Sequence, residues 1–335
     1  MTALLPWHRA PWQSLLERLH NGKLPHALLL SGPAGIGKNQ FAALFAQTLL
    51  CETGAAQGLP CGQCRSCLLY AANSHPDLRI VSPPEPGKVI GVDQVREIGQ
   101  YLAHTSQYGG HKTVIITPAD QMNVNAANSL LKTLEEPSAW ALILLISARP
   151  GRLPATVLSR CQSVHFAAPK SAEAGPWLAG RIGPDQDPVL LLSLAEGAPL
   201  RALELAESNV LGERSQIMLG LEKLAQGEAD PSAVADQFLK IGAQQTLYWM
   251  YNWVADMIRH LSCGGEHFVI NRDMQDRLGK LADGIGLQGL HAYLAQLNET
   301  LRLTAGQVNP QLSMENVLMA WQDLFCSAVH RKAER

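Results

Sequence analysis

The sequence predicts an α/β protein with a mostly parallel sheet in its first half and helices in its second half. Strand-like apolar runs alternate with helical stretches from Ala27 to Phe166, which is typical of parallel sheets. The first of these runs leads into a phosphate-binding loop pattern, Gly-x-x-x-x-Gly-Lys, at Gly32–Lys38. After Pro169 the strand-like runs thin out, and alanine and leucine dominate. We therefore expect a P-loop nucleotide-binding domain at 1–166, a small helical lid at 167–208 and an all-α region at 209–335.

The composition is that of a globular protein with two or three domains. The 335 residues are 47% hydrophobic and 17% charged, and the net charge of −2 argues against a chain-wide nucleic-acid-binding surface. The start carries no secretory-signal pattern, and no apolar run of about 18 residues predicts a membrane span. We therefore expect a cytoplasmic protein without membrane contact, and expect its seven cysteines to be metal ligands or free thiols.

The phosphate-binding loop follows an apolar strand and opens a helix. The glycines let backbone N–H groups turn toward phosphate, and the helix at 39–50 would present its positive N-terminus. The side chain of Lys38 is expected to reach the terminal phosphates. Asn39 stands where the pattern has Ser or Thr, whose hydroxyl ligates Mg²⁺, and an amide oxygen is a poorer ligand there. The candidate nucleotide-binding residues of this loop are Gly32, Gly35, Gly37, Lys38 and Asn39.

Four cysteines predict a metal module directly after the loop helix. Three of them form Cys-x-x-Cys-x-x-Cys, and one precedes this run, so that the ligands are Cys51, Cys61, Cys64 and Cys67. Four thiolates at short, turn-compatible spacing suit a tetrahedral Zn²⁺ site, and a closed site of this kind is structural. An iron–sulfur cluster and four unrelated buried thiols are the alternatives.

Strand ends supply the other candidate residues of a nucleotide site. A second central strand, 112–117, runs into Thr117-Pro118, where an active nucleotidase of this class carries an Asp for Mg²⁺ and a catalytic Glu. Asp120 lies beyond the strand, so a turn or helix N-cap role is favoured over metal binding. A third strand, 141–146, ends at Ser147, which could sense the terminal phosphate of a nucleotide.

With these residues in place, the chain resembles the clamp-loader branch of the AAA+ ATPases. The resemblance rests on the four-cysteine module after the P-loop helix, on the stretch Leu130–Pro137 (Leu-Leu-Lys-Thr-Leu-Glu-Glu-Pro) and on Ser159-Arg160-Cys161. These specific motifs lie between about Pro11 and Phe166. The resemblance extends over the rest of the chain by architecture only, and it implies a lid and then a helical collar that oligomerises.

The resemblance implies roles for two arginines, and it gives a meaning to the positions that depart from the motifs of active ATPases. Counted from the Leu130–Pro137 stretch, the Asp-Glu pair of the motor subunits falls on Thr117 and Pro118, which together with Asn39 indicates a non-hydrolysing subunit. Arg160 would act as a trans arginine finger on ATP in a neighbouring motor subunit; the alternative is an ordinary intramolecular salt bridge. Arg201 matches the lid arginine that contacts a nucleotide in its own subunit.

The resemblance also implies partners. They are the motor subunits (gamma/tau) and the delta subunit of a hetero-pentamer that loads the sliding clamp for DNA polymerase III, with primer-template DNA contacted through the assembled complex. We expect Zn²⁺ as a structural cofactor and ATP or ADP as a candidate ligand. We expect no polymerase active site and no intrinsic ATPase. An active ATPase motor of the same family and an unrelated zinc-containing AAA+ protein are the competing hypotheses.

Overall fold

The computed structural model describes residues 3–85, 87–108, 110–263, 270–283, 285–304 and 309–333. The chain divides into two compact units. The first unit comprises Met1–Trp177 and Gly197–Arg201, and the second comprises Leu178–Glu196 and Ala202–Arg335. None of the helices in these described ranges is long and apolar enough to cross a membrane.

The first unit is built on one five-stranded sheet in which all neighbouring strands are parallel, in the order β2-β3-β4-β1-β5. The strands are β1 (Ala27–Ser31), β2 (Leu78–Val81), β3 (Lys112–Ile116), β4 (Ala141–Ser147) and β5 (Gln162–His165). Every residue of β1 is buried, because the strand lies between β4 and β5 and both faces of the sheet are covered. Ser31 pairs with Ser147 and His165, so the carboxyl ends of these three strands meet at one edge.

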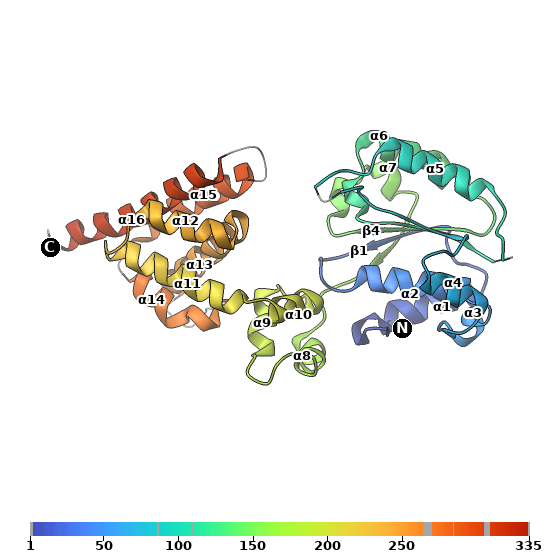
Figure 1. Cartoon of the computed structure of the whole chain (residues 1–335), viewed down its shortest axis with the longest axis horizontal. Helices are drawn as coiled ribbons and strands as arrows, with labels where there is room; N and C mark the ends of the chain where they lie inside the picture. The colour runs from blue at the N-terminus through green and yellow to red at the C-terminus, as the bar shows by residue number, and fades with distance from the viewer. Residues whose placement is uncertain are drawn as a thin grey trace. The chain divides into compact units, whose positions relative to one another are not determined.

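Helices cover both faces of this sheet (Figure 1). On one face, Leu28 and Leu30 share a core with Phe41, whereas on the other Leu29 shares a core with Leu130. This alternation follows from the two-residue period of a strand. The helices of the first face are α1 (Arg9–His20) and α2 (Lys38–Leu50), and those of the second are α5 (Val92–Ala103), α6 (Val124–Glu135) and α7 (Ala155–Leu158).

Short elements complete the first unit. The four-cysteine segment carries α3 (Gly54–Gln57) and α4 (Arg65–Ala71), and the loops carry the 3-10 turns η1 (Pro6–His8), η2 (Ala119–Gln121) and η3 (Pro150–Arg152). Asp120 lies inside η2 and caps no helix, so the turn role expected for it is confirmed and the N-cap alternative is wrong.

The segment expected to form a lid is helical. It contains α8 (Ser171–Ala179), α9 (Pro188–Leu194) and α10 (Pro199–Glu207). These helices are divided between the two compact units, and the boundaries of a separate lid stay a prediction.

The described part of the second unit contains helices only. Its core is built around Phe238, Trp253 and Trp321, all nearly inaccessible to solvent. The remaining elements are α11 (Val210–Ala225), α12 (Pro231–Ile241), α13 (Ala243–Cys263), η4 (Arg272–Met274), α14 (Gln275–Ala282), α15 (Leu287–Thr304) and α16 (Pro310–Ala333). The α/β fold class and the all-α second half predicted from the sequence are thus confirmed.

Candidate functional site

The phosphate-binding loop lies at the carboxyl edge of the sheet, between β1 and α2. Gly37 has φ +92°, a left-handed conformation that favours glycine, and forms the N-cap of α2. The buried Lys38 ammonium donates to the carbonyl oxygens of Gly32 (2.7 Å) and Pro33 (2.5 Å). Burial lowers the pKa of Lys38, and the nearby charge of Asp120 opposes this shift. The lysine therefore lies inside the loop, and its contact with a terminal phosphate stays a prediction.

Two neighbouring segments pack against the loop glycines. A Cβ atom at Gly32 would lie 2.1 Å from the carbonyl oxygen of Phe166. One at Gly35 would lie 2.8 Å from the Cβ of Arg201, and the Leu200 N–H donates to the Gly35 carbonyl (2.9 Å). The segment with Arg201 thus lies against the loop to which the resemblance assigned it, and glycine is required at both loop positions by close approach.

Trp7 and His8 also hold the loop in place, and no sequence pattern predicted this contact. The Trp7 indole N–H and His8 Nε2–H both donate to the Ile36 carbonyl, each at 2.9 Å. Because a carbonyl only accepts, His8 is the neutral donor tautomer. Burial, opposed by the bond to Ile36 and assisted by the charge of Lys38, lowers the pKa of His8 from 6.5 to about 4.

This histidine makes loop stability depend on pH. Between pH 6.5 and 4, the unfolded chain binds a proton at His8 and the folded chain does not. The contribution of His8 to folding stability is therefore fully present above pH 6.5 and is lost as the pH falls through this window. We expect His8→Gln to reduce the difference in melting temperature between pH 7 and pH 5, measured by circular dichroism. The matched control His20→Gln alters an exposed histidine and should keep the wild-type difference. An unchanged pH dependence in His8→Gln would contradict this role.

Two of the three positions that depart from the ATPase pattern, Asn39 and Thr117, are hydrogen-bonded to each other. The Thr117 hydroxyl donates to the Asn39 side-chain oxygen at 2.8 Å. This bond uses one of the two lone pairs of the amide oxygen that stands in place of the usual Mg²⁺ hydroxyl. Pro118, the third departing position, has no polar side-chain atom. Neither strand-end position therefore offers an anionic oxygen for Mg²⁺ or a base for water.

Asp120 and Ser147 are joined beside the loop. The Ser147 hydroxyl donates to Asp120 Oδ1 at 2.7 Å, and Arg149 Nε lies 3.4 Å from Asp120 Oδ2. The Arg149 backbone N–H donates to Ser147 Oγ at 3.0 Å. The serine expected to sense a phosphate is thus hydrogen-bonded to a buried carboxylate, which also attracts the Lys38 charge.

Arg160 follows α7 and forms an intramolecular ion pair. Its guanidinium lies 2.7 Å from Glu135 Oε1 and donates to the Thr156 carbonyl at 3.0 Å. The two ion-paired side chains are 36% and 50% exposed. The salt bridge considered as an alternative is therefore present in this structure, and it joins two of the three sequence features that carry the resemblance.

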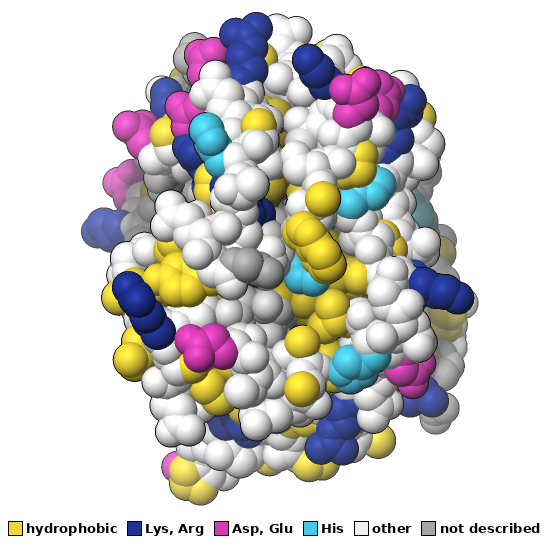
Figure 2. All heavy atoms as spheres, turned by 90° about the vertical axis from the view of Figure 1, so that its right-hand side faces the viewer, with side chains coloured by type: hydrophobic (Ala, Val, Ile, Leu, Met, Phe, Trp, Pro, Cys, Tyr) yellow, Lys and Arg dark blue, Asp and Glu magenta, His cyan; other side chains and the backbone are white. Residues whose placement is uncertain are grey.

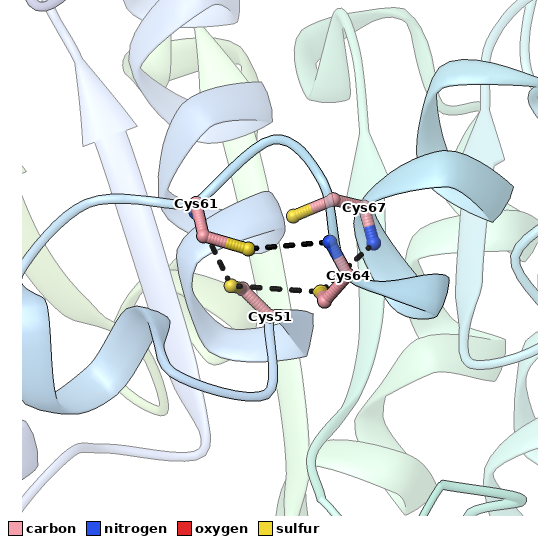
Figure 3. A group of neighbouring side chains, drawn as sticks. All are labelled: Cys51, Cys61, Cys64 and Cys67. Atoms are coloured by element: carbon pink, nitrogen blue, oxygen red, sulfur yellow. Dashed lines mark hydrogen bonds between the residues drawn. The ribbon is translucent and has the colours of Figure 1, made fainter.

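The four cysteines form one cluster between α2 and α4 (Figure 3). Their sulfur atoms all lie within 4.8 Å of one another, and Cys51 Sγ is 3.8 Å from Cys64 Sγ. Four thiolates at about 2.3 Å from one Zn²⁺ would be separated by about 3.8 Å, so the cluster fits a single tetrahedral ion and is too tight for several irons.

Backbone N–H groups of the cluster donate to its own sulfurs. The Cys61 N–H donates to Cys51 Sγ and the Cys64 N–H to Cys61 Sγ, both at 3.3 Å. The Cys67 N–H donates to Cys64 Sγ at 3.4 Å. Such bonds lower the pKa of Cys61 to about 6, whereas burial and the neighbouring sulfurs raise that of Cys67 to about 12. A bound cation would offset the raised pKa of Cys67 by stabilising its thiolate, as expected for metal ligands.

Comparisons with known proteins identify the family. The model of the family described as DNA polymerase III, delta subunit, matches residues 7–170, and that described as its C-terminal part matches residues 208–323. DNA polymerase III subunit delta' of Pseudomonas aeruginosa is 36% identical over 329 residues, which is 97% of this chain and 99% of that protein. Subunit tau/gamma of Haemophilus influenzae is 32% identical, but over only 60% of this chain and 30% of that protein.

A solved structure supports the fold. A DNA polymerase III, gamma subunit-related protein of Thermotoga maritima superimposes with a TM-score of 0.52 at 17% identity, covering 94% of this chain and 99% of that one. At this identity the likeness shows the fold alone, which agrees with the predicted AAA+ P-loop domain and following helices. The near-complete match to subunit delta' is decisive for the family: this chain belongs to the DNA polymerase III delta-prime family.

Proposed function

We propose that the chain is the delta-prime-like stator of a clamp-loader complex, which helps load a sliding clamp on primed DNA without hydrolysing ATP itself. The observation that carries the stator role is the hydrogen bond between Thr117 and Asn39. It ties together the two positions at which an active subunit organises Mg²⁺. Family membership supports the complex to which the stator belongs.

The loop keeps the means to hold phosphate. Its glycine backbone and buried Lys38 stand at the helix N-terminus, where anions bind. Nucleotide would take the place of the Gly32 and Pro33 carbonyls as partner of Lys38, with Arg201 beside the loop. Without a metal-organising oxygen or a catalytic carboxylate, such a nucleotide would not be turned over.

Arg160 is proposed to act in trans. Its ion pair with Glu135 is about one third to one half exposed, and pairs of this kind contribute about 0–1 kcal/mol. An arginine finger accelerates phosphoryl transfer by about 10³–10⁵, equivalent to about 4–7 kcal/mol. Release of Arg160 from Glu135 therefore costs much less than the interaction that a neighbouring γ-phosphate would provide.

Replacing Glu135 with glutamine tests whether the ion pair with Arg160 contributes much less than the proposed interaction of Arg160 with ATP. We expect Glu135→Gln to leave single-turnover ATP hydrolysis by the reconstituted complex within about fivefold of wild type, since the exposed pair contributes about 1 kcal/mol or less. Glu136→Gln, a neighbouring exposed carboxylate, is the matched control. A decrease of tenfold or more in Glu135→Gln alone would show that Glu135 itself acts at the ATP site.

Zn²⁺ is proposed as the structural ion of the four-cysteine cluster. Cys51, Cys61, Cys64 and Cys67 supply all four ligands, so no coordination position is left for substrate. The ion would cross-link α2 to the start of α4, and it has no part in phosphoryl transfer.

Reconstitution tests the proposed assembly. The chain is mixed with the motor subunits (gamma/tau) and the delta subunit and examined by native mass spectrometry. We expect one hetero-pentamer containing this chain, with ATP turnover stimulated by primed DNA. Motor and delta subunits that form the same complex and load the clamp equally well without this chain would contradict the stator role.

A further inference from the structure

Trp140 is an exposed, conformationally unusual residue at the amino edge of the sheet. It directly precedes β4, at the edge opposite the phosphate-binding loop. Its side chain is 69% exposed, and its φ of +70° lies in the left-handed region. Bulky residues rarely adopt this conformation, and strained positions cluster at binding sites. Folding alone would favour glycine or asparagine here, so the tryptophan points to a role outside the fold.

The strained tryptophan is held in place. The Lys112 N–H donates to the Trp140 carbonyl at 3.0 Å, which pairs the starts of β3 and β4. The His111 ring packs edge-on against the indole, with the ring centres 5.7 Å apart. The aromatic ring is therefore presented to solvent in a defined position.

Two hollows flank this tryptophan. Their volumes are about 480 and 390 Å³, and residues Ser138–Ala141 line both. The larger hollow is also lined by Leu102 and His104, and the smaller by Leu24 and His26. An exposed aromatic side chain between two partly apolar hollows resembles the anchors of protein interfaces.

The charge around the hollows favours an acidic occupant. Among the described residues that line them, none is Asp or Glu, whereas His26, His104 and Lys112 are present. Burial lowers the pKa of His111, so this ring contributes the contact with Trp140 and no positive charge at neutral pH. The Lys112 ammonium donates to the carbonyls of Tyr101 (2.7 Å) and His104 (3.1 Å). The partial negative charges of these carbonyls are smaller than the full charge of the ammonium, so the group as a whole stays positive. Figure 2 looks onto this side of the first unit: histidines lie among hydrophobic side chains near its centre, and acidic side chains lie nearer its rim.

We propose that Trp140 and its two flanking hollows form a docking surface for an acidic peptide segment of a protein partner. Trp140 is the anchor, apolar side chains of the segment enter the hollows, and carboxylates face His104 and Lys112. Single-stranded nucleic acid is the less suitable ligand, because it needs a track of exposed cations. Among the described residues that line the hollows, Lys112 alone is Lys or Arg, and it is 7% exposed.

Peptide display on the full-length chain tests the surface. A random dodecapeptide library is selected on the wild-type chain and counter-selected on Trp140→Gly, and the enriched peptides are synthesised for fluorescence polarisation. We expect sequences that combine Asp or Glu with large apolar residues, and at least about 30-fold weaker binding to Trp140→Gly. Glycine suits the left-handed backbone, so the melting temperature of this variant should not fall. Val124→Ser, at a second apolar residue that is 69% exposed, should bind as wild type.

A charge substitution separates the possible ligands. We expect His104→Glu, at an exposed histidine of the larger hollow, to weaken the acidic peptides about tenfold at low salt and less at high salt. Four results would overturn the proposal: no enrichment over the counter-selection, a consensus without acidic residues, tighter binding to His104→Glu, or equal loss in Val124→Ser. Tighter binding of a dodecathymidylate than of any selected peptide, lost in Trp140→Gly, would overturn it in favour of nucleic acid.

Discussion

Replacing Arg160 with alanine is expected to lower single-turnover ATP hydrolysis at the adjacent motor-subunit site by about 10³-fold, with the complex still assembled. The expectation rests on a guanidinium that is one third exposed and held by an exposed carboxylate, so it is available to a neighbour. The measurement is rapid-quench hydrolysis in the reconstituted complex, with assembly checked by native mass spectrometry. Steady-state turnover should fall less than hydrolysis at this single site if other ATP sites of the complex do not depend on Arg160.

Arg96→Ala is the matched control, since Arg96 is an exposed arginine of α5 that pairs with Asp93 one turn away. It should leave hydrolysis unchanged. Wild-type rates at every site in Arg160→Ala would show that the ion pair with Glu135 is the whole role of Arg160.

Replacing Cys64 with serine is expected to abolish binding of one Zn²⁺ per chain and to unfold the segment around α3 and α4. Cys64 Sγ lies 3.8 Å from Cys51 Sγ and accepts the Cys67 N–H, so its removal affects both sides of the cluster. Apparent binding energies of structural zinc are about 10–16 kcal/mol and are coupled to folding. Elemental analysis measures the metal, and limited proteolysis with circular dichroism measures the loss of structure.

Cys263→Ser provides the control for this substitution. Cys263 is an exposed thiol at the end of α13, outside the four-cysteine cluster, and its replacement should leave the metal content unchanged. A wild-type chain that contains no metal, or a Cys64→Ser chain that keeps it, would contradict the zinc assignment.

Local patterns predicted much of this protein. The apolar run before Gly32 identified a central buried strand, because a strand covered on both faces contains consecutive apolar residues. The spacing of Cys61, Cys64 and Cys67 predicted the four-cysteine cluster, because side chains three residues apart can meet around one ion. In both cases, the information lies within a few consecutive residues.

The hydrogen bonds around the proposed site could not be predicted from local sequence patterns. The bond from Thr117 to Asn39 joins residues 78 positions apart, and the bond from Ser147 to Asp120 spans 27. Such pairs are set by which strands are neighbours in the sheet. The left-handed backbone of Trp140 also has no sequence signal, since the residue that marks this conformation is normally glycine or asparagine.

ATP turnover by the purified chain is the most direct test of the central claim. The claim is that this subunit supports ATP hydrolysis in a neighbouring subunit and hydrolyses no ATP itself. The chain is incubated with ATP, Mg²⁺ and primed DNA, and released phosphate is measured for the wild type and for Lys38→Ala. The bond between Thr117 and Asn39 and the absence of a polar side chain at Pro118 predict no turnover above background in either protein. Turnover by the wild type that Lys38→Ala abolishes would contradict the claim and identify an active motor subunit.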